Sequence, residues 1–236
     1  MENNEAFAVI ARICCDLPQK FGLPRQSGLV PALKARIVFE PPFRRPEALR
    51  GLEGFSHIWL LWAFSESGGR NWSPTVRPPR LGGNTRLGVF ATRSPFRPNP
   101  LGLSAVALEG IVQDPVLGPT LLVAGADLMD GTPIYDIKPY LPYADCIPEA
   151  RGGFAQAAPQ AALQVKIPPE LLARVPADKQ EALLALLAQD PRPHYQNDPE
   201  RIYGFSFAGL ALRFQVRDEI LTVCNISVLP GHTETG

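Results

Sequence analysis

Short apolar segments separated by proline and glycine dominate the first 130 residues of the chain. They are rich in β-branched and aromatic side chains, which is typical of strands. The pattern predicts strands at residues 6–13, 29–39, 55–64, 86–92, 103–112 and 120–126. Gly110 interrupts the alternation of the fifth segment and predicts a β-bulge there. Because no long amphipathic helix appears before about residue 168, we expect a mainly β fold with the strands in an antiparallel β-barrel.

The pattern of the chain changes near residue 149, where Gly152 and Gly153 precede an Ala/Gln-rich stretch that is typical of a linker or a weakly specified strand. Apolar residues at helical spacing then predict a short helix from Pro169 to about Val175 and a second from Pro176 to Gln189. Two further strands, 202–216 and 219–229, are predicted to form a β-hairpin that turns at residues 217–219.

This change predicts two domains. Residues 1–148 would form the barrel, and residues 149–236 would form a small α+β domain of two helices and a hairpin. A domain of that size cannot bury much surface alone. We therefore expect it to pack on the barrel or on a partner subunit.

Composition narrows the class of protein. With 236 residues, 45% of them hydrophobic, the chain can bury a core. No apolar run reaches the roughly 18–20 residues that a membrane helix needs, and the acidic N-terminus is unlike a secretory signal. The four cysteines lack C-x-x-C spacing and the three histidines are isolated. We expect a cytoplasmic protein with reduced cysteines and no metal site.

Charge is unevenly distributed, although the formal net charge is zero. Between Ser67 and Leu108 there are six arginines, no lysine and no acid. The guanidinium group pairs with phosphate or carboxylate through two hydrogen bonds and also stacks on bases. A solvated basic surface and an anion-binding site both fit this stretch equally well.

Common catalytic motifs are absent from the chain. There is no G-x-G-x-x-G after a strand, no G-x-x-x-x-G-K-[ST], no H-E-x-x-H and no G-x-S-x-G. This argues against dinucleotide enzymes, P-loop ATPases, zinc hydrolases and serine hydrolases. It also argues against the methyltransferase fold that binds its cofactor on a glycine-rich loop.

Four segments nevertheless resemble the TsaA-like family of tRNA N6-methyltransferases, which methylate N6-threonylcarbamoyladenosine next to the anticodon. The segments are GLPRQSGL at 22–29, FSHIWL at 55–60, TRSPFRPNPLGLS at 92–104 and DGTPIYDIKPY at 130–140. Residues 190–204 are similar to the domain that bacterial members add. The resemblance implies a β-barrel that binds S-adenosylmethionine, tRNA as the substrate, and a homodimer with the cofactor near the subunit interface.

The resemblance also assigns residues. By motif, the cofactor contacts would be Pro24, Arg25, Gln26, His57, Ile58, Arg93, Leu103, Asp130, Gly131, Thr132 and Pro133. Arg25 or Arg93 could hold the methionyl carboxylate, and Leu103 and Ile58 offer apolar surface to the adenine. Without the family, His57 would equally be a core residue, and residues 130–133 would be an ordinary turn. Trp59 and Trp62 are interpreted as core.

The candidate catalytic residues are Asp136, Tyr135 and His57, which stay unranked. The N6 nitrogen of the target base is urea-like and a poor nucleophile, so an acceptor for its proton should help. Arg97 is expected to bind the threonyl carboxylate, and the prolines around it favour a functional loop over a strand. Arg192, Tyr195 and Arg201 are candidates for tRNA binding, although surface arginines beside a helix end fit nearly as well.

Two other functions remain open from the sequence. One is a non-catalytic module that senses S-adenosylmethionine and binds RNA. The other is a barrel enzyme that acts on a small anionic metabolite and uses the same arginines to bind its carboxylate.

Overall fold

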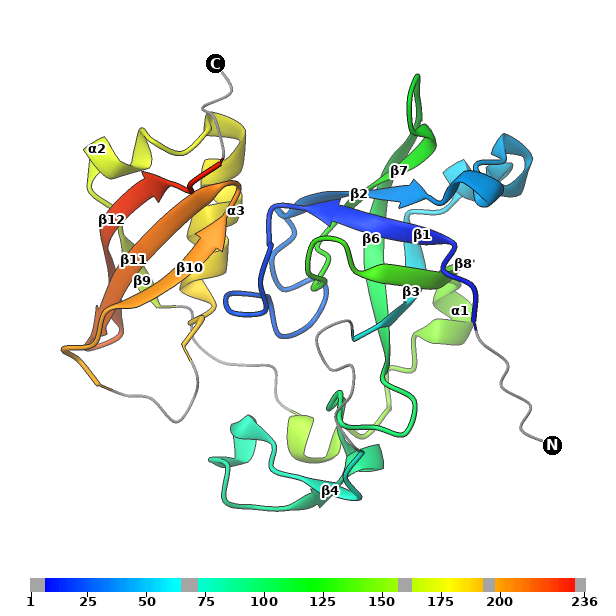
Figure 1. The fold of residues 1–236 in the computed structure, drawn as a ribbon. Coiled ribbons are helices and arrows are strands. Elements are labelled where there is room, and N and C mark those ends of the chain that lie inside the picture. Colours follow the sequence, from blue (N-terminus) through cyan, green and yellow to red (C-terminus); the bar gives the residue numbers. More distant parts are fainter. Residues whose placement is uncertain (1–6, 65–71, 157–162, 193–197, 232–236) are drawn as a thin grey trace.

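A computed structural model describes residues 7–64, 72–156, 163–192 and 198–231. The chain forms two sheets, and a two-stranded ribbon lies outside both of them (Figure 1). The mainly β class predicted from the sequence is confirmed. Among the described residues, no helix combines the length and the apolar character needed to cross a membrane.

The first sheet contains six antiparallel strands, each paired with a neighbour on both sides. They are β1 (Ala11–Cys15), β2 (Lys34–Phe39), β3 (His57–Ala63), β6 (Leu101–Asp114), β7 (Gly118–Ala124) and β8 (Pro133–Pro139). The order is β1-β2-β7-β6-β3-β8, and β8 pairs with β1 again, so the sheet closes on itself. Closure leaves no strand edge open. Alternate apolar side chains such as Ile13, Ile58 and Leu121 are fully buried inside it.

The predicted strands differ from the observed ones mainly at their ends. β1 and β2 begin at Ala11 and Lys34, later than predicted. The pairing of β6 with β7 shifts register between Leu108 and Gly110, which confirms the predicted bulge. β8 is a strand that the apolar pattern does not predict, because proline stands at both of its ends, where a missing N–H is tolerated.

The strand predicted at 86–92 is wrong. Only β5 (Leu87–Gly88) is extended, and it pairs with β4 (Thr75–Val76) in the ribbon outside the sheets. The following residues tighten into the 3₁₀ helix η6 (Val89–Ala91). The apolar and β-branched composition of this stretch suits a strand, but residues 92–100 continue into a proline-rich loop with no ladder partner.

Short helical turns occupy the connections of the first half. They are η1 (Pro41–Phe43), η2 (Pro46–Leu49), η3 (Leu52–Gly54), η5 (Pro79–Leu81) and, after β8, α1 (Pro142–Asp145) and η7 (Gly153–Ala155). Proline supplies the first residue of four of these turns, where its fixed φ angle and missing N–H cost nothing.

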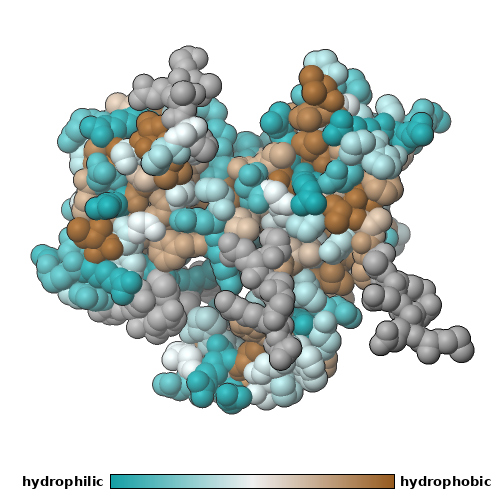
Figure 2. Space-filling view, in the orientation of Figure 1, coloured by the Kyte–Doolittle hydropathy of each residue, from teal (hydrophilic) through white to brown (hydrophobic). Residues whose placement is uncertain are grey.

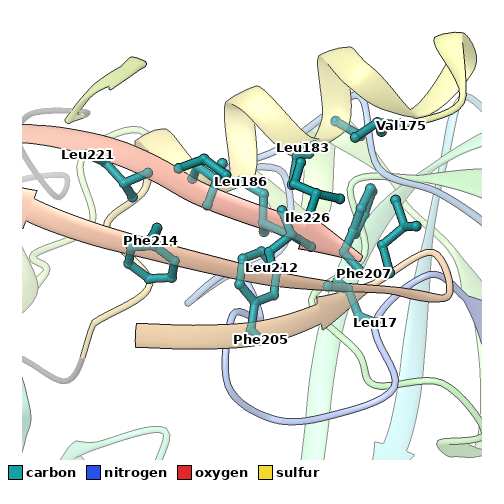
Figure 3. Close-up of a cluster of buried hydrophobic side chains, with 14 of the residues drawn as sticks. Leu17, Val175, Leu183, Leu186, Phe205, Phe207, Leu212, Phe214, Leu221 and Ile226 are labelled. Carbon is teal, nitrogen blue, oxygen red and sulfur yellow. The ribbon is translucent and has the colours of Figure 1, made fainter. Parts of the chain in front are cut away.

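The second sheet has the order β10-β11-β12-β9. Its strands are β9 (Gln164–Lys166), β10 (Tyr203–Phe207), β11 (Leu210–Arg217) and β12 (Ile220–Val228). The two predicted helices are present as α2 (Pro169–Leu172) and α3 (Ala177–Ala188). Figure 3 shows Leu183 and Leu186 of α3 directed at Leu212 and Ile226 of the sheet.

The single strand predicted at 202–216 is wrong, because it is two strands joined by a tight turn. The chain reverses at Ala208 and Gly209, where Ala208 adopts φ 49°. Alanine rarely adopts this left-handed conformation, so an alanine in the sequence does not indicate a turn of this kind. The predicted turn at 217–219 is confirmed, with Asp218 and Glu219 also at positive φ.

The loop between β1 and β2, residues 16–33, packs on the second sheet. Leu17 is 2% exposed and belongs to the same buried cluster as Phe207 and Leu186 (Figure 3). The backbone N–H of Ala208 donates to the Asp16 carbonyl at 2.9 Å, and Lys179 of α3 pairs with the Asp16 carboxylate at 2.6 Å. The two sheets are thus connected through this loop, whose Leu17, Val30 and Leu33 are buried.

Candidate active site

A pocket of about 500 Å³ lies at one end of the closed sheet. Its walls come from residues 20–26 after β1, from Trp59, Trp62 and Phe64 along β3 and just after it, from residues 92–103 leading into β6, and from residues 127–132 before β8. Pockets that bind small molecules have volumes of roughly 300–1,000 Å³. The antiparallel topology brings these four distant stretches to the same end of the sheet.

Six of the eleven predicted cofactor contacts line this pocket, together with the predicted substrate contact Arg97. The six are Pro24, Arg25, Gln26, Arg93, Leu103 and Thr132. Leu103 is 55% exposed although it lies within a strand, so it presents a large apolar side chain to the pocket. The pocket therefore combines cations with apolar surface.

Arg93 and Gln26 connect two of the walls. The Arg93 guanidinium donates a hydrogen bond to the Gln26 amide oxygen. Arg97 instead donates to the backbone carbonyls of Thr92 at 2.6 Å and Val89 at 3.3 Å. Arg97 thus holds the turn that places Arg93 as well as lining the pocket.

Arg25 is the third arginine of the pocket, and its environment is unusual. Burial lowers its pKa, the charge of Asp190 raises it, and the nearby cation Arg80 lowers it again. One of its N–H groups donates to the backbone carbonyl of Asp190 at 3.2 Å. Because like charges repel, gathering several arginines here favours an anion between them.

Asp127 is the carboxylate of the pocket, and it is held by two buried residues. The Ser104 hydroxyl donates to Asp127 Oδ1 at 2.6 Å, and the Trp62 indole N–H donates to Ser104 Oγ at 3.0 Å. Ser104 is 1% exposed and Trp62 is 9% exposed. Burial raises the pKa of Asp127, while the Ser104 bond and the charge of Arg93 lower it. The net effect raises the pKa of Asp127 from its ordinary value.

The remaining predicted cofactor contacts do not line the pocket. Ile58 is fully buried inside the closed sheet, and His57 lies at the start of β3, where its ring nitrogen contacts Ser56. Asp130 accepts a hydrogen bond from the Cys15 N–H at 2.9 Å. Gly131, at φ 74°, is in the left-handed conformation that glycine allows.

Residues 130–133 therefore shape the loop that presents Thr132, and Pro133 begins β8. Thr132 is 2% exposed, and its hydroxyl donates to the Met129 carbonyl at 2.6 Å. This segment acts on the pocket through Met129 and Thr132, both of which line it.

The three candidate catalytic residues lie outside the pocket lining. Asp136 pairs with Lys138 at 2.8 Å, Tyr135 packs against Phe7 with ring centroids 5.9 Å apart, and His57 packs near Tyr140. His57 begins β3, two residues before Trp59, which does line the pocket. The structure thus leaves these three side chains out of the pocket lining.

The C-terminal candidates are arranged differently from the prediction. Arg192 forms a two-point ion pair with Asp190, at 2.8 Å and 2.9 Å, so it fixes the residue that receives Arg25. Arg201 lies over the Tyr203 ring at 5.3 Å. Tyr195 lies outside the described residues.

Residues 72–97 form what we call the arginine lobe, which contains the β4–β5 ribbon and lies outside both sheets (Figure 1). Its surface is largely hydrophilic and occupies the bottom of the view in Figure 2. Arg77, Arg80 and Arg86 are exposed on it. Two aromatic residues are exposed as well, Trp72 at 51% and Phe90 at 73%. Arg97 lies 5.8 Å from the centre of the Phe90 ring, so the lobe is continuous with the pocket.

Comparison with known families accounts for both halves of the chain. The tRNA-methyltransferase O N-terminal domain matches residues 12–146, and the TrmO C-terminal domain matches residues 160–229. The chain belongs to the TrmO family. The family expected from the four sequence segments is confirmed.

Individual TrmO relatives are similar over nearly the whole length. The tRNA (adenine(37)-N6)-methyltransferase of Escherichia coli is 43% identical, over 90% of this chain and 93% of its own length. A Pseudomonas aeruginosa protein described as a putative S-adenosylmethionine-dependent methyltransferase is 42% identical, over 89% of this chain and 92% of its own. The crystal structure of TrmO from P. aeruginosa matches with a TM-score of 0.79 at 35% identity, over 97% of this chain and 99% of that chain.

The sequence alone does not predict the Trp62–Ser104–Asp127 chain of hydrogen bonds. Burial confirms the interpretation of Trp62 as core, although this residue also lines the pocket. Trp59 is only half-buried and donates to Asp145 at 2.9 Å. Asp127 stands three positions before the nearest TrmO-like segment, so no motif points to it.

Proposed function

We propose that this protein is an S-adenosylmethionine-dependent tRNA methyltransferase that methylates N6 of N6-threonylcarbamoyladenosine at position 37, next to the anticodon. The observation that carries the proposal is the arginine-lined pocket at the end of the closed sheet, in a chain of the TrmO family. We further propose that the closed sheet is the cofactor-binding β-barrel of residues 1–148, and that residues 149–236 form a second domain.

The pocket residues fit S-adenosylmethionine. Arg25 and Arg93 can pair with its methionyl carboxylate, and Leu103 with Phe64 offers apolar surface to the adenine. Pro24, Gln26 and Thr132 complete the predicted contacts within the lining. We assign Asp130, Gly131 and Pro133 to holding the loop that carries Thr132.

When bound, S-adenosylmethionine supplies an electrophilic methyl group on a sulfonium. The residues of the chain position the acceptor nitrogen in line with that methyl group and exclude competing water. Arg97 adds a cation at the same pocket, which suits the threonyl carboxylate of the modified base.

We propose that tRNA binds across the arginine lobe. Arg77, Arg80 and Arg86 can contact phosphates, while Trp72 and Phe90 can stack on unpaired bases of the anticodon loop. Arg192 is a weaker candidate, because its guanidinium pairs with Asp190. The homodimer expected from the family resemblance stays a prediction, which sedimentation of the purified protein would test.

Transfer of a labelled methyl group tests the activity. Purified protein, S-adenosylmethionine labelled on the methyl group and threonylcarbamoylated tRNA should yield labelled N6-methyl-N6-threonylcarbamoyladenosine. Tight cofactor and tRNA binding without transfer would instead support the non-catalytic sensing module. A tRNA affinity that does not depend on salt would argue against phosphate contacts altogether.

A further inference from the structure

Asp127 differs in charge from the other ionisable residues that line the described pocket. Among the described residues that line the pocket, it is the one carboxylate, and the lining contains no histidine, cysteine or tyrosine. The charged groups that share the pocket are Lys20, Arg25, Arg93 and Arg97, all of them cations. In this described part of the lining, Asp127 is therefore the one carboxylate that can accept a proton released inside the pocket.

The hydrogen bonds of Asp127 fix the orientation of its carboxylate. An indole N–H can only donate, so Ser104 accepts from Trp62 and directs its own proton to Asp127 Oδ1. Asp127 is thus an acceptor at that oxygen. Gly102 maintains the arrangement, because a Cβ at this position would overlap the Trp62 ring.

We propose that Asp127 is the proton acceptor for methyl transfer, taking the N6–H proton of the target adenine. The inference rests on the proposed function. In the step, the N6–methyl bond forms as the sulfur–methyl bond breaks, and the sulfur keeps the electron pair of the broken bond. The N6–H proton passes to the Asp127 carboxylate and then to solvent.

The environment of Asp127 suits this role. Burial raises the pKa of Asp127, while the Ser104 hydrogen bond and the Arg93 charge lower it. A carboxylate with a raised pKa is a stronger base, and general bases of this kind contribute about 10²- to 10⁴-fold to rates. Asp136, Tyr135 and His57 do not line the pocket, whereas Asp127 does.

Single-turnover methyl transfer by Asp127→Asn tests the proposal. The amide oxygen can still accept from Ser104, so the fold and cofactor affinity should be kept. We expect the transfer rate to fall at least about 100-fold, with the dissociation constant for S-adenosylmethionine, measured by calorimetry, within about threefold of wild type. Asp178→Asn, an exposed aspartate in the first turn of α3, is the matched control and should keep the wild-type rate.

A second measurement separates proton transfer from a structural role. Ser104→Ala removes a bond that lowers the pKa of Asp127, so the acid limb of the pH–rate profile should move to higher pH. The ¹³C NMR titration of the Asp127 carboxyl group, followed without substrate, should move in the same direction. In Asp127→Asn that acid limb should disappear.

Two outcomes would overturn the inference. One is an Asp127→Asn rate within about threefold of wild type. The other is an acid limb that stays fixed in Ser104→Ala while the NMR titration of Asp127 moves. Either result would leave the proposed function standing, because wild-type protein would still transfer the methyl group. Absence of transfer by the wild-type protein would contradict the proposed function itself.

Discussion

Arg25 in the pocket donates a hydrogen bond to the backbone carbonyl of Asp190 at 3.2 Å, across 165 positions of sequence. Asp190 follows α3 and has φ 51°, and Arg192 holds its carboxylate with two hydrogen bonds. The C-terminal half thus contacts the pocket through Asp190. This contact helps to position Arg25, and it is independent of any contact that the C-terminal half makes with RNA.

Asp190→Asn should weaken cofactor binding. Asparagine tolerates positive φ, so the backbone carbonyl that accepts from Arg25 is kept. The ion pair with Arg192 is removed, and with it the negative charge that stabilises the Arg25 cation. We expect the affinity for S-adenosylmethionine to fall about 3- to 10-fold, roughly 1 kcal/mol, as measured by calorimetry. Arg192→Ala should have a similar effect, whereas unchanged affinity in both variants would mean that Arg25 needs no such support.

The same ion pair predicts a pH dependence of stability. Burial would raise the pKa of Asp190, but the Arg192 hydrogen bonds and charge outweigh it and lower the pKa. A depressed folded-state pKa gives stability that is present above the ordinary aspartate pKa of about 3.9 and disappears as pH falls through the folded value. Denaturant unfolding should show wild type above Asp190→Asn by about 1 kcal/mol at neutral pH, and the difference should vanish in acid. A difference that persists in acid would assign the effect to packing.

Arg93→Ala should abolish most cofactor binding while the fold is kept. Arg93 is exposed, and its guanidinium bonds to Gln26 across the pocket, so the substitution removes little core packing. A charge-assisted pair with a carboxylate contributes about 1.5–3 kcal/mol, which corresponds to a loss in affinity of roughly 10- to 100-fold. Calorimetry with unchanged affinity would refute the assignment.

Gly102→Ala should displace Trp62 and so weaken the Trp62–Ser104–Asp127 hydrogen bonds without changing any of these three residues. The added methyl group would overlap the Trp62 ring, and overpacking of this kind costs about 1–3 kcal/mol. We expect a lower melting temperature and a lower transfer rate. Gly110→Ala is the matched control, because a Cβ at that site meets nothing. Equal effects of the two substitutions would point to the strand backbone and not to Trp62.

Removing arginines from the lobe should weaken tRNA binding in a salt-dependent way. For the double variant Arg77→Ala/Arg86→Ala, we expect the slope of log affinity against log salt to fall by about one for each phosphate that the protein no longer neutralises. Arg213→Ala, an exposed arginine on β11, controls for general loss of positive charge. The same decrease in slope for the control would place the RNA on the second sheet.

The sequence predicts those strands and helices that have a clear local pattern of apolar residues. Alternating apolar positions locate most of the closed sheet, and helical spacing locates α3. The turn at Ala208 escapes prediction because its left-handed conformation uses a residue that rarely adopts it. The 86–92 segment is wrongly predicted because strand-like composition cannot say whether a pairing partner exists.

The residues of the candidate site also fall into two groups, those that the sequence predicts and those that only the fold brings together. The TrmO-like segments locate the arginines and Leu103, because these residues lie inside continuous motifs. The Asp127 chain depends on which strands meet, since Trp62, Ser104 and Asp127 come from β3, β6 and the loop before β8. His57 shares a strand with Trp62, yet it lies at the other end of that strand.

Mass spectrometry of tRNA nucleosides tests the central claim most directly. Cells that lack this gene should contain N6-threonylcarbamoyladenosine without its N6-methyl group, and expression of the wild-type chain should restore that single methyl group. Expression of Arg93→Ala should restore it poorly. An unchanged nucleoside profile in the deletion strain, or a methyl group missing from a different nucleoside, would contradict the proposed function.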